Sequence, residues 1–405
     1  MAIKSHTPQS LMKKRNLQIL LESILKNEPI SRADLEKVTG LARPTISALV
    51  SELISADLVR EIGYGNSKGG KKPILLEFNK SFGFIAALDL GAVKYLTALF
   101  DLNGNIIDEI RIDLENELWA DEILSKAIST LKQIIDDNKL TDKRLIGIGI
   151  ASPGAINPDT GKISIAPNIK GLDELDVIKI VKQSFDAPIF IDSSFKLAAL
   201  GEKKQEYAKN SKVLMFVDYG IGIGLGVVID NKIFRGATYA GGEIGYLYIP
   251  GEPDPVNMAD PKKFGYFENT TSGLAYAKLA QEKIKAGIKS IMLDEVGGNL
   301  KKISAKTVFD CAKKGDLLAN EIIDQILQRF AIGVANAVIL FNPDLLIIGG
   351  GISRAGDILL EPLKKEISKL VPIAPQIMIT KIEDRAPLIG AWGLVNGNID
   401  LISFV

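Results

Sequence analysis

S-R-A-D-L-E-K-V-T-G-L-A-R-P-T-I-S-A-L-V-S-E-L-I-S-A-D-L-V, residues 31–59, is the stretch that decides the fold of the N-terminal part of the chain. It predicts two helices joined by a tight turn. Ser31 is a typical N-cap residue for the first helix. Asp34, three positions later, can form a relative of the capping box with Ser31 and complement the helix dipole. Gly40 favours a left-handed end to that helix. Pro44 fits the first turn of the second helix, which has no use for its N–H.

Each of these helices has an apolar side, and the second also has a side suited to contact with DNA. Apolar residues at helical spacing are expected to be buried; they are Leu35, Val38, Ile46, Leu49, Val50, Leu53 and Ile54. The other side of the second helix carries short side chains and one cation, which suits entry into a DNA major groove. The DNA contacts predicted here are Arg32, Arg43, Pro44, Thr45, Ser47 and Ser51. An ordinary surface helical hairpin is the alternative, because this pattern is easily matched by chance.

A glycine-rich basic loop follows the second helix. The β-type runs 58–62 and 73–78 flank the loop G-Y-G-N-S-K-G-G-K-K and predict a hairpin. A hairpin in this position is a wing, and Lys68, Lys71 and Lys72 at its tip can reach phosphate or a minor groove. A solvated turn is the alternative for such a loop. Its position directly after the second helix favours the wing.

The distribution of charge supports a DNA-binding N-terminal segment. Residues 1–80 hold thirteen Lys and Arg against eight Asp and Glu, a net charge of +5. The whole chain holds 49 of each sign, so the remainder carries −5. A neutral protein with one basic segment is expected to present only that segment to a polyanion.

The length and composition of the chain set limits on the rest. A chain of 405 residues suggests two or three domains, and 46% hydrophobic with 24% charged residues is typical of a soluble globular protein. We predict no apolar run long enough to cross a bilayer and no signal-peptide core in residues 1–10. The expected location is cytoplasmic, without membrane contact.

The scarcity of cysteine and histidine argues against several kinds of site. Cys311 is the only cysteine, which excludes an internal disulfide and a cysteine-cluster metal site. His6 is the only histidine, and it lies near the N-terminus. Zinc binding and histidine acid–base catalysis are therefore not expected in the folded body.

From residue 84 onward the sequence alternates strand-type and helix-type segments. Several strands end in glycine turns, which predicts α/β lobes with ligand crevices at the carboxyl ends of strands. A hairpin of strands before the first helix is the order expected in lobes of the actin/hexokinase type. The predicted domains are a winged helix-turn-helix at 1–80, a first lobe at 83–192 to which a C-terminal helix at 386–405 returns, and a second lobe at 193–385.

With these motifs in view, the chain resembles the ROK family of sugar kinases and sugar-responsive repressors. The resemblance covers nearly the whole chain, in motifs that follow one order. They are G-G-K-K-P at 69–73, D-L-G at 89–91, G-I-G-I-A-S-P-G at 147–154, A-P-N at 166–168, A-A-L-G-E at 198–202, G-I-G-I-G at 220–224, G-G-E-I-G-Y at 241–246 and F-N-P-D-L-L-I-I-G-G-G at 341–351. It implies an N-terminal winged helix-turn-helix followed by a two-lobed α/β actin/hexokinase-like body.

The family divides into kinases and repressors, and the groups that its kinases use are replaced here. In the family's first phosphate loop, D-x-G-G-T, the last two positions are Ala92 and Val93. In the second loop, G-T-G-I-G, Ile221 replaces the threonine. None of these side chains donates a hydrogen bond to phosphate. The sugar-holding asparagine becomes Ser193, and the catalytic aspartate becomes Ser194. A serine cannot accept the sugar proton without its own base, and Asp192 would lie about 7 Å away along a strand. We expect a non-enzyme without a nucleotide cofactor.

The resemblance also implies that the family's structural zinc is lost. Its histidine is replaced by Tyr246, and its cysteine positions fall on Ala259, Pro261 and Tyr266. Packing of apolar and aromatic residues is expected to hold that loop instead; these are Pro261, Phe264, Tyr266 and Phe267. No metal is expected.

Two of the family's sugar contacts remain. They are Glu243 and Glu268, whose paired carboxylates suit the vicinal hydroxyls of a sugar. The rest of the predicted ligand site is Pro153, Gly154, Asn168, Ser193, Ser194 and Tyr246. The alternative is that the two acids are inherited fold supports around a closed cleft. The sequence does not identify the sugar.

The leading hypothesis is a transcriptional repressor of carbohydrate-use genes. Its expected partners are a palindromic double-stranded operator, a sugar effector in the cleft between the lobes, and further copies of the chain in a homodimer or tetramer. One alternative is a sugar kinase that retains a DNA-binding domain. The other is a regulator controlled by a protein partner, with a vestigial sugar cleft.

Overall fold

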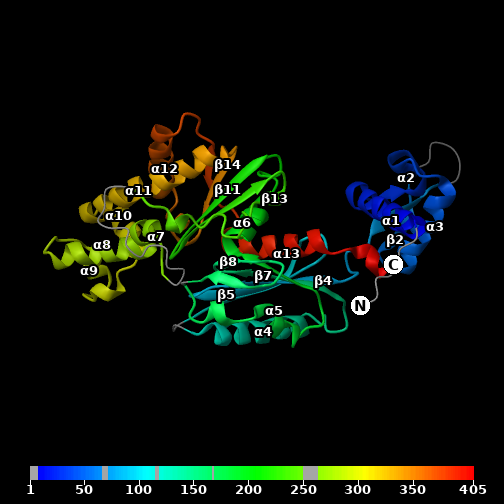
Figure 1. Ribbon diagram of the computed structural model, residues 1–405, viewed down its shortest axis with the longest axis horizontal. Helices are drawn as coiled ribbons and strands as arrows, with labels where there is room; N and C mark the ends of the chain where they lie inside the picture. Colours follow the sequence, from blue (N-terminus) through cyan, green and yellow to red (C-terminus); the bar gives the residue numbers. More distant parts are fainter. Residues whose placement is uncertain (1–7, 66–71, 115–117, 167, 250–262) are drawn as a thin grey trace.

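A computed structural model describes residues 8–65, 72–114, 118–166, 168–249 and 263–405 of the chain. Its parts follow one another along the long axis of the molecule (Figure 1). The N-terminal helices lie at one end, the first large sheet lies in the middle, and the second large sheet with its helices lies at the other end. The structure therefore has the fold class that the sequence predicts.

The N-terminal part combines helices with a three-stranded sheet of order β1-β3-β2. Its elements are α1 Pro8–Asn27, β1 Ile30–Ser31, α2 Arg32–Thr39, α3 Arg43–Ser55, β2 Val59–Tyr64 and β3 Ile74–Phe78. β2 and β3 pair antiparallel as the predicted hairpin. The tip of the wing, with Lys68 and Lys71, lies outside the described residues.

Local capping explains why the two central helices begin and end where they do. Ser31 Oγ accepts from Asp34 N at 3.2 Å and donates to Asp34 Oδ2 at 2.6 Å. Gly40 ends α2 with a φ of 69°, and its N–H donates to Glu36 O at 2.9 Å. Pro44 lies in the first turn of α3. These features confirm the predicted helix ends.

One predicted core residue of these helices is wrong. Val38 is 56% exposed, whereas Leu35 is fully buried. Leu35 is the buried residue of α2, and Thr39, one turn later, is half-buried with its Oγ1 donating to Leu35 O at 2.7 Å. Val38 falls beside this line because positions three apart on a helix are offset around its axis.

The first lobe is built on a sheet of order β10-β7-β4-β5-β6, with β10, β7 and β4 parallel. Its strands are β4 Phe84–Leu90, β5 Lys94–Phe100, β6 Ile106–Asp113, β7 Leu145–Ser152 and β10 Ile189–Ser193. The helices α4 Ala120–Asp137 and α5 Val177–Lys182 cover one face. The small pair β8 Ala155–Ile156 and β9 Ile163–Ile165 lies near the end of β7.

The second lobe is built on a sheet of order β13-β12-β11-β14-β15. Its strands are β11 Val213–Tyr219, β12 Ile223–Ile229, β13 Lys232–Ile233, β14 Leu345–Gly349 and β15 Gln376–Ile379. Its helices are α7 Tyr266–Thr271, α8 Gly273–Lys285, α9 Met292–Glu295, α10 Ala305–Lys313, α11 Leu317–Phe341 and α12 Asp357–Leu370. Short turns of 3₁₀-helix join them: η2 Ile244–Tyr246, η3 Leu300–Lys302, η4 Gly351–Ala355 and η5 Glu383–Arg385.

Two helices lie between the two large sheets (Figure 1). α6 Ser194–Lys203 packs against β12 and β11, and α13 Ala386–Asn398 packs against α6 and against β7 and β4 of the first sheet. The C-terminal segment therefore returns to the first lobe. It ends in η6 Leu401–Phe404, beside the N-terminal helices.

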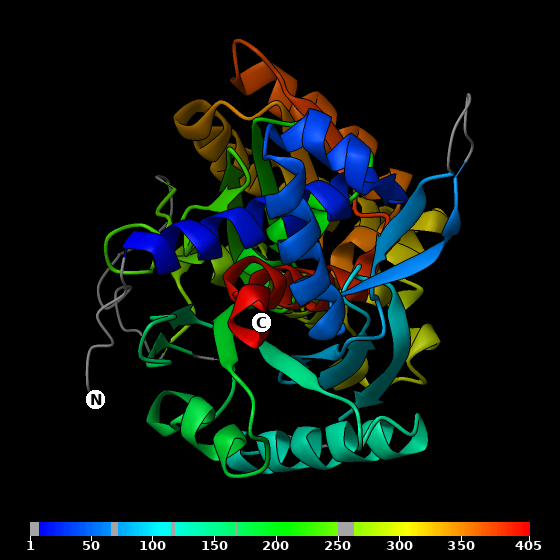
Figure 2. The same ribbon diagram turned by 90° about the vertical axis from the view of Figure 1, so that its right-hand side faces the viewer.

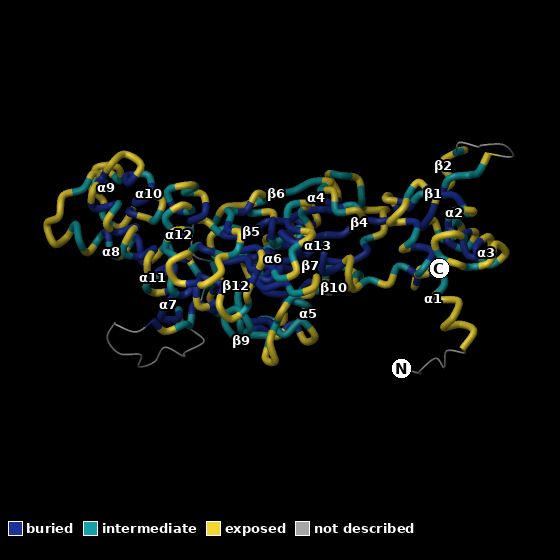
Figure 3. Tube along the Cα trace, turned by 90° about the horizontal axis from the view of Figure 1, so that it is seen from above, coloured by how far each residue is buried: buried dark blue, intermediate teal, exposed yellow. Residues whose placement is uncertain are grey.

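The core follows the two sheets and these central helices, where the buried residues concentrate (Figure 3).

α11 departs from the expectation that no apolar run could cross a bilayer. By length and composition alone, this helix of 25 residues could cross a membrane. In the structure, however, 61% of its apolar window is buried inside the protein. This helix packs against α7, α8, α10 and α12 as the core helix of the second lobe.

Candidate functional site

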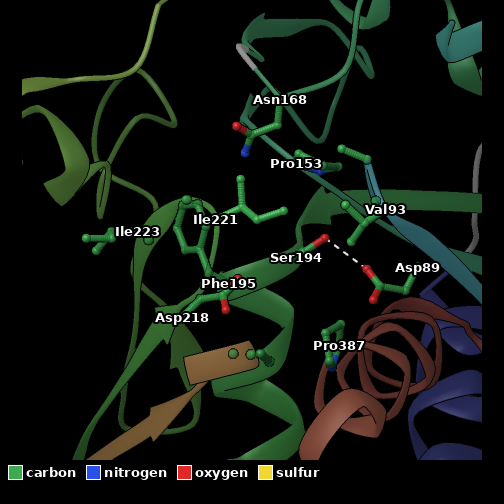
Figure 4. Close-up of a pocket in the computed structure, with 18 of the residues that line it drawn as sticks. Asp89, Val93, Pro153, Asn168, Ser194, Phe195, Asp218, Ile221, Ile223 and Pro387 are labelled. Carbon is green, nitrogen blue, oxygen red and sulfur yellow. Dashed lines mark hydrogen bonds between the residues drawn. The ribbon is translucent and has the colours of Figure 1, made fainter. Parts of the chain in front are cut away.

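A cavity of about 370 Å³ lies between the two lobes, where strands of both sheets end (Figure 4). Asp89 lines it near the end of β4, Asp218 near the end of β11 and Gly350 directly after β14. Ser194 lines it as the first residue of α6. Crevices at the carboxyl ends of strands are where open α/β sheets bind ligands.

The structure brings most of the predicted ligand residues to this cavity. Those that line it are Pro153, Gly154, Asn168, Ser194, Glu243, Tyr246 and Glu268. Ser193 does not line it, because its side chain is buried and its Oγ donates to Gly154 O at 2.6 Å. Ser193 therefore fixes the position of Gly154 at the wall of the cavity.

Two oxygen atoms in this cavity stand out among the described residues. Glu243 Oε1 and Asn168 Oδ1 are buried, and neither has a hydrogen-bond partner. Burial raises the pKa of Glu243 to about 7, against the opposing effect of Lys196. A buried acceptor without a partner costs about 1–3 kcal/mol. A ligand that supplies hydroxyl donors would remove this cost.

Glu268 lies beside these atoms. Its Oε1 accepts from Ile223 N at 2.6 Å. A Cβ at Gly222 would lie 2.6 Å from Glu268 Oε1 and 3.1 Å from Asn168 Nδ2, so glycine lets both side chains approach this loop. Burial, with a smaller effect from the nearby Glu243, raises the pKa of Glu268 to about 7 against the opposing hydrogen bond from Ile223 N.

Ser194, which the resemblance aligned with a catalytic aspartate, has an unexpected neighbour. Ser194 Oγ donates to Asp89 Oδ1 at 3.0 Å (Figure 4). Burial raises the pKa of Asp89 to about 7, and the bond from Ser194 opposes that rise. Asp192, which the sequence offered as a nearby carboxylate, is buried and accepts from Arg235 Nε at 2.7 Å. Asp89 is thus the carboxylate that meets Ser194.

Sequence reasoning missed a charged cluster at the other side of the cavity. Asp384 accepts from Arg354 Nη2 at 2.6 Å and also pairs with Lys94 and Arg111. These cations hold the pKa of Asp384 below its ordinary value despite its burial. No local pattern predicts this cluster, because its members come from β5, β6, η4 and η5.

The two loops that the resemblance aligned with kinase phosphate loops carry apolar side chains at the cavity. Val93 and Ile221 both line the cavity, and Ile221 is 38% exposed. The turn at Gly350 keeps a φ of 78°, and a Cβ there would lie 2.5 Å from Tyr219 O. The side chains of Val93 and Ile221 have no hydrogen-bond donor to offer at the cavity.

The region of the family's zinc loop holds aromatic contacts. The ring of Tyr266 lies 5.1 Å from that of Tyr248, and Phe267 stacks on Phe330 at 5.9 Å. Tyr246 Oη donates to Lys263 O at 2.8 Å. Ala259 and Pro261 lie outside the described residues, and within those residues we find no group of three metal-ligating side chains.

The predicted DNA contacts lie on the surface of the N-terminal part. Arg43, Pro44, Ser47, Ser51 and Lys72 are exposed, and Thr45 and Arg32 are half-buried. Arg43 Nε pairs with Glu36 Oε2 at 2.6 Å, and Arg32 Nη2 pairs with Glu61 Oε1 at 2.9 Å. Pairs of exposed charges contribute little to stability, so DNA phosphate can compete for either arginine.

The fold and the cavity define a class of protein: a two-lobed body of the sugar-kinase type that carries a winged helix-turn-helix. The model of the family described as "ROK family" matches residues 85–398. A xylose repressor of Caldicellulosiruptor bescii is 33% identical over 400 residues, 98% of each chain. The chain belongs to the ROK family.

Solved structures agree with this assignment. A ROK family transcriptional regulator, described as a homologue of the Escherichia coli Mlc protein, has a TM-score of 0.75 at 25% identity. The match covers 95% of this chain and 96% of that one. A ROK glucokinase from Streptomyces griseus has a TM-score of 0.66 at 22% identity and covers 77% of this chain and 99% of its own. This likeness concerns the fold alone.

Proposed function

We propose that the protein is a sequence-specific transcriptional repressor of carbohydrate-use genes, controlled by a sugar or sugar derivative in the cavity between its lobes. The observation that carries the proposal is the pair of buried acceptors without partners, Glu243 Oε1 and Asn168 Oδ1. Both residues line the cavity, and the chain also has an exposed recognition helix. The protein named xylose repressor in C. bescii makes D-xylose the first sugar to test.

The proposed ligand contact uses the two buried carboxyls. Glu243 has one oxygen without a partner, and Glu268 already accepts a backbone N–H. Vicinal hydroxyls of a sugar can donate to both carboxyls, and each such bond to a charged group is worth about 1.5–3 kcal/mol. The cavity of about 370 Å³ is large enough for a monosaccharide.

The proposed control acts through the arrangement of a dimer or tetramer on DNA. Two winged helices would bind half-sites about 34 Å apart, or a multiple of that distance, in a palindromic operator. A sugar that prefers one angle between the lobes would change the spacing of the two recognition helices. Such a preference typically amounts to about 1–3 kcal/mol.

The test measures operator binding by fluorescence anisotropy, with DNA from the protein's own promoter region and with D-xylose, D-glucose and N-acetylglucosamine. We expect one sugar to weaken operator binding by at least about fivefold. Glu243→Gln should weaken binding of that sugar by roughly 10-fold or more and leave operator binding in its absence unchanged. Glu206→Gln, at an exposed ion pair on the body, is the matched control. Failure to bind this DNA, with or without sugar, contradicts the proposal.

The contact between Ser194 and Asp89 favours one second candidate, a sugar kinase in which Asp89 receives the sugar proton. We expect this activity to be absent, because the apolar Val93 and Ile221 occupy the phosphate loops. A coupled ATPase assay across hexoses and pentoses checks this, with Asp89→Asn as the decisive variant. Turnover at an ordinary enzymatic rate that this variant abolishes would establish the kinase instead.

A further inference from the structure

The backbones of helices α6 and α13 meet directly at two glycines. A Cβ at Gly390 of α13 would lie 1.8 Å from Leu197 O of α6. A Cβ at Gly201 of α6 would lie 2.1 Å from Ala386 O of α13. With backbones in direct contact at two points, neither helix can move far without the other. We call them the central helix pair.

The central helix pair begins at the cavity. Ser194 and Phe195 in the first turn of α6 line the cavity, as does Pro387 in the first turn of α13 (Figure 4). The pair is also wedged between the lobes. A Cβ at Gly149 of β7 would lie 2.4 Å from Ala391 O, and one at Gly226 of β12 would lie 2.2 Å from Phe195 O. A change in the angle between the sheets must therefore shift this pair.

The far end of α13 reaches the winged helix. Figure 2 shows the C-terminus beside the N-terminal helices. The ring of Phe404 packs edge-on against Phe82 at 5.5 Å, and the guanidinium of Arg144 lies 4.3 Å from Phe82 and 5.0 Å from Phe404. Asp400, just before η6, pairs with Lys14 of α1. We call Phe82, Arg144 and Phe404 the aromatic joint.

The apolar core is continuous across the same boundary. One cluster of buried residues contains Leu20 and Ile24 of α1 and also Trp392 and Val395 of α13. Phe82 belongs to this cluster and lies between the last strand of the wing and β4. The winged helix is thus docked on the end of the helix that starts at the cavity.

We propose that the central helix pair carries the effect of the sugar to the winged helix, and that the aromatic joint is the contact through which it acts. This inference rests on the proposed function and names the residues of its regulation. Coupling between sites is carried through contiguous packed elements that have two arrangements. None of the three joint residues lines the cavity, and none is a predicted DNA contact, but Phe404 shares a small hollow at the end of α3 with Ser51. Altering the joint should therefore reduce the coupling while sugar binding and operator binding are retained.

The experiment measures operator dissociation constants of the full-length protein with and without D-xylose, by fluorescence anisotropy. The coupling ratio is the constant with sugar divided by the constant without it. Phe404→Ala removes the ring, and Phe404→Tyr retains it. Leu370→Ala on α12 is the matched control, because Leu370 is 43% exposed and Phe404 is 39% exposed. Thermal shift with D-xylose measures sugar binding by each variant.

We expect the wild-type ratio to lie between about 5 and 150. Phe404→Ala should reduce it to below about 2, while sugar binding and operator binding without sugar stay within about threefold of wild type. Phe404→Tyr and Leu370→Ala should retain the wild-type ratio. A wild-type ratio in Phe404→Ala overturns the inference, as does a loss of coupling in Leu370→Ala.

A second measurement separates failure of this inference from failure of the proposed function. Amide hydrogen exchange of the wild-type protein is measured with and without operator DNA. Docking through the joint predicts that DNA changes exchange in residues 399–404 and in α13. If D-xylose leaves operator binding unaltered but DNA changes this exchange, the choice of effector is wrong and the joint is retained. Unchanged exchange with DNA bound overturns the joint.

Discussion

At the scale of single residues, two buried carboxyls define the chemistry of the cavity. The pKa of Glu243 and that of Glu268 are each raised by burial to about 7. An ionised carboxylate accepts hydrogen bonds with both oxygens and more strongly than a protonated carboxyl, which also carries a donor. The proposed sugar site is therefore sensitive to pH near neutrality.

The pH dependence of sugar binding follows from these shifts. The folded protein holds protons on Glu243 and Glu268 up to about pH 7, while the unfolded chain releases them near its ordinary value of 4.5. These groups therefore favour the folded state below about pH 4.5, and their contribution weakens as the pH rises to about 7. A sugar whose hydroxyls donate to the ionised carboxylates should bind more tightly as the pH rises over the same range.

We expect the thermal shift caused by D-xylose to be larger at about pH 8 than at about pH 5.5. Glu243→Gln should flatten this dependence, because glutamine does not titrate. A larger shift at the acidic pH would mean that the protonated carboxyls bind the ligand. That result would contradict the assigned roles of Glu243 and Glu268.

At the scale of elements, the recognition helix α3 presents one cation at its start. Arg43 is 77% exposed in its side chain and pairs with Glu36, which is 34% exposed. Arg43→Ala should reduce discrimination between the operator and random DNA by roughly 10-fold or more, since a good base contact is worth about 1–3 kcal/mol. Competition gel shifts measure this ratio. Glu36→Gln frees Arg43 and should retain the discrimination, whereas equal ratios in Arg43→Ala and wild type would refute the groove assignment.

The wing is expected to contact phosphate without reading sequence. Lys71→Ala with Lys72→Ala should weaken binding to operator and random DNA alike. It should also reduce the slope of log affinity against log salt by about 0.9 for each phosphate that a lysine no longer neutralises. Salt titrations of operator binding measure this slope. Lys209→Ala, on the surface of the body, is the control and should leave it unchanged; an unchanged slope in the double variant would remove the wing from the DNA interface.

The central helix pair allows a sharp comparison within one helix. A Cβ at Gly390 would meet Leu197 O, whereas a Cβ at Gly397 would meet nothing within 4 Å. Gly390→Ala should destabilise the protein by about 3 kcal/mol through forced separation of α6 and α13. Gly397→Ala should be neutral or stabilise it by up to about 1 kcal/mol. Chemical denaturation measures both, and equal stabilities would show that the helices separate freely.

At the scale of the whole molecule, the sequence predicts what short-range chemistry determines. The N-cap at Ser31 and the left-handed end at Gly40 involve partners three or four positions away, and the structure confirms both. The contact between Ser194 and Asp89 joins positions 105 apart. The Asp384 cluster likewise depends on how distant elements meet. Asp89 and Asp218 each lie near the end of a buried strand, and this position in the sequence indicates a place at the cavity.

The return of the C-terminal helix to the first sheet has a consequence for synthesis of the chain. The winged helix is synthesised before the two-lobed body, and α13, which packs on β7 and β4, is synthesised after every strand of the first sheet. Until then, one face of the first sheet has no cover, and the residues that dock the winged helix are missing. A nascent chain that stops before α13 would therefore carry the winged helix together with an open first sheet that is prone to aggregate. Synthesis of α13 is therefore the step that completes the packing of the first lobe.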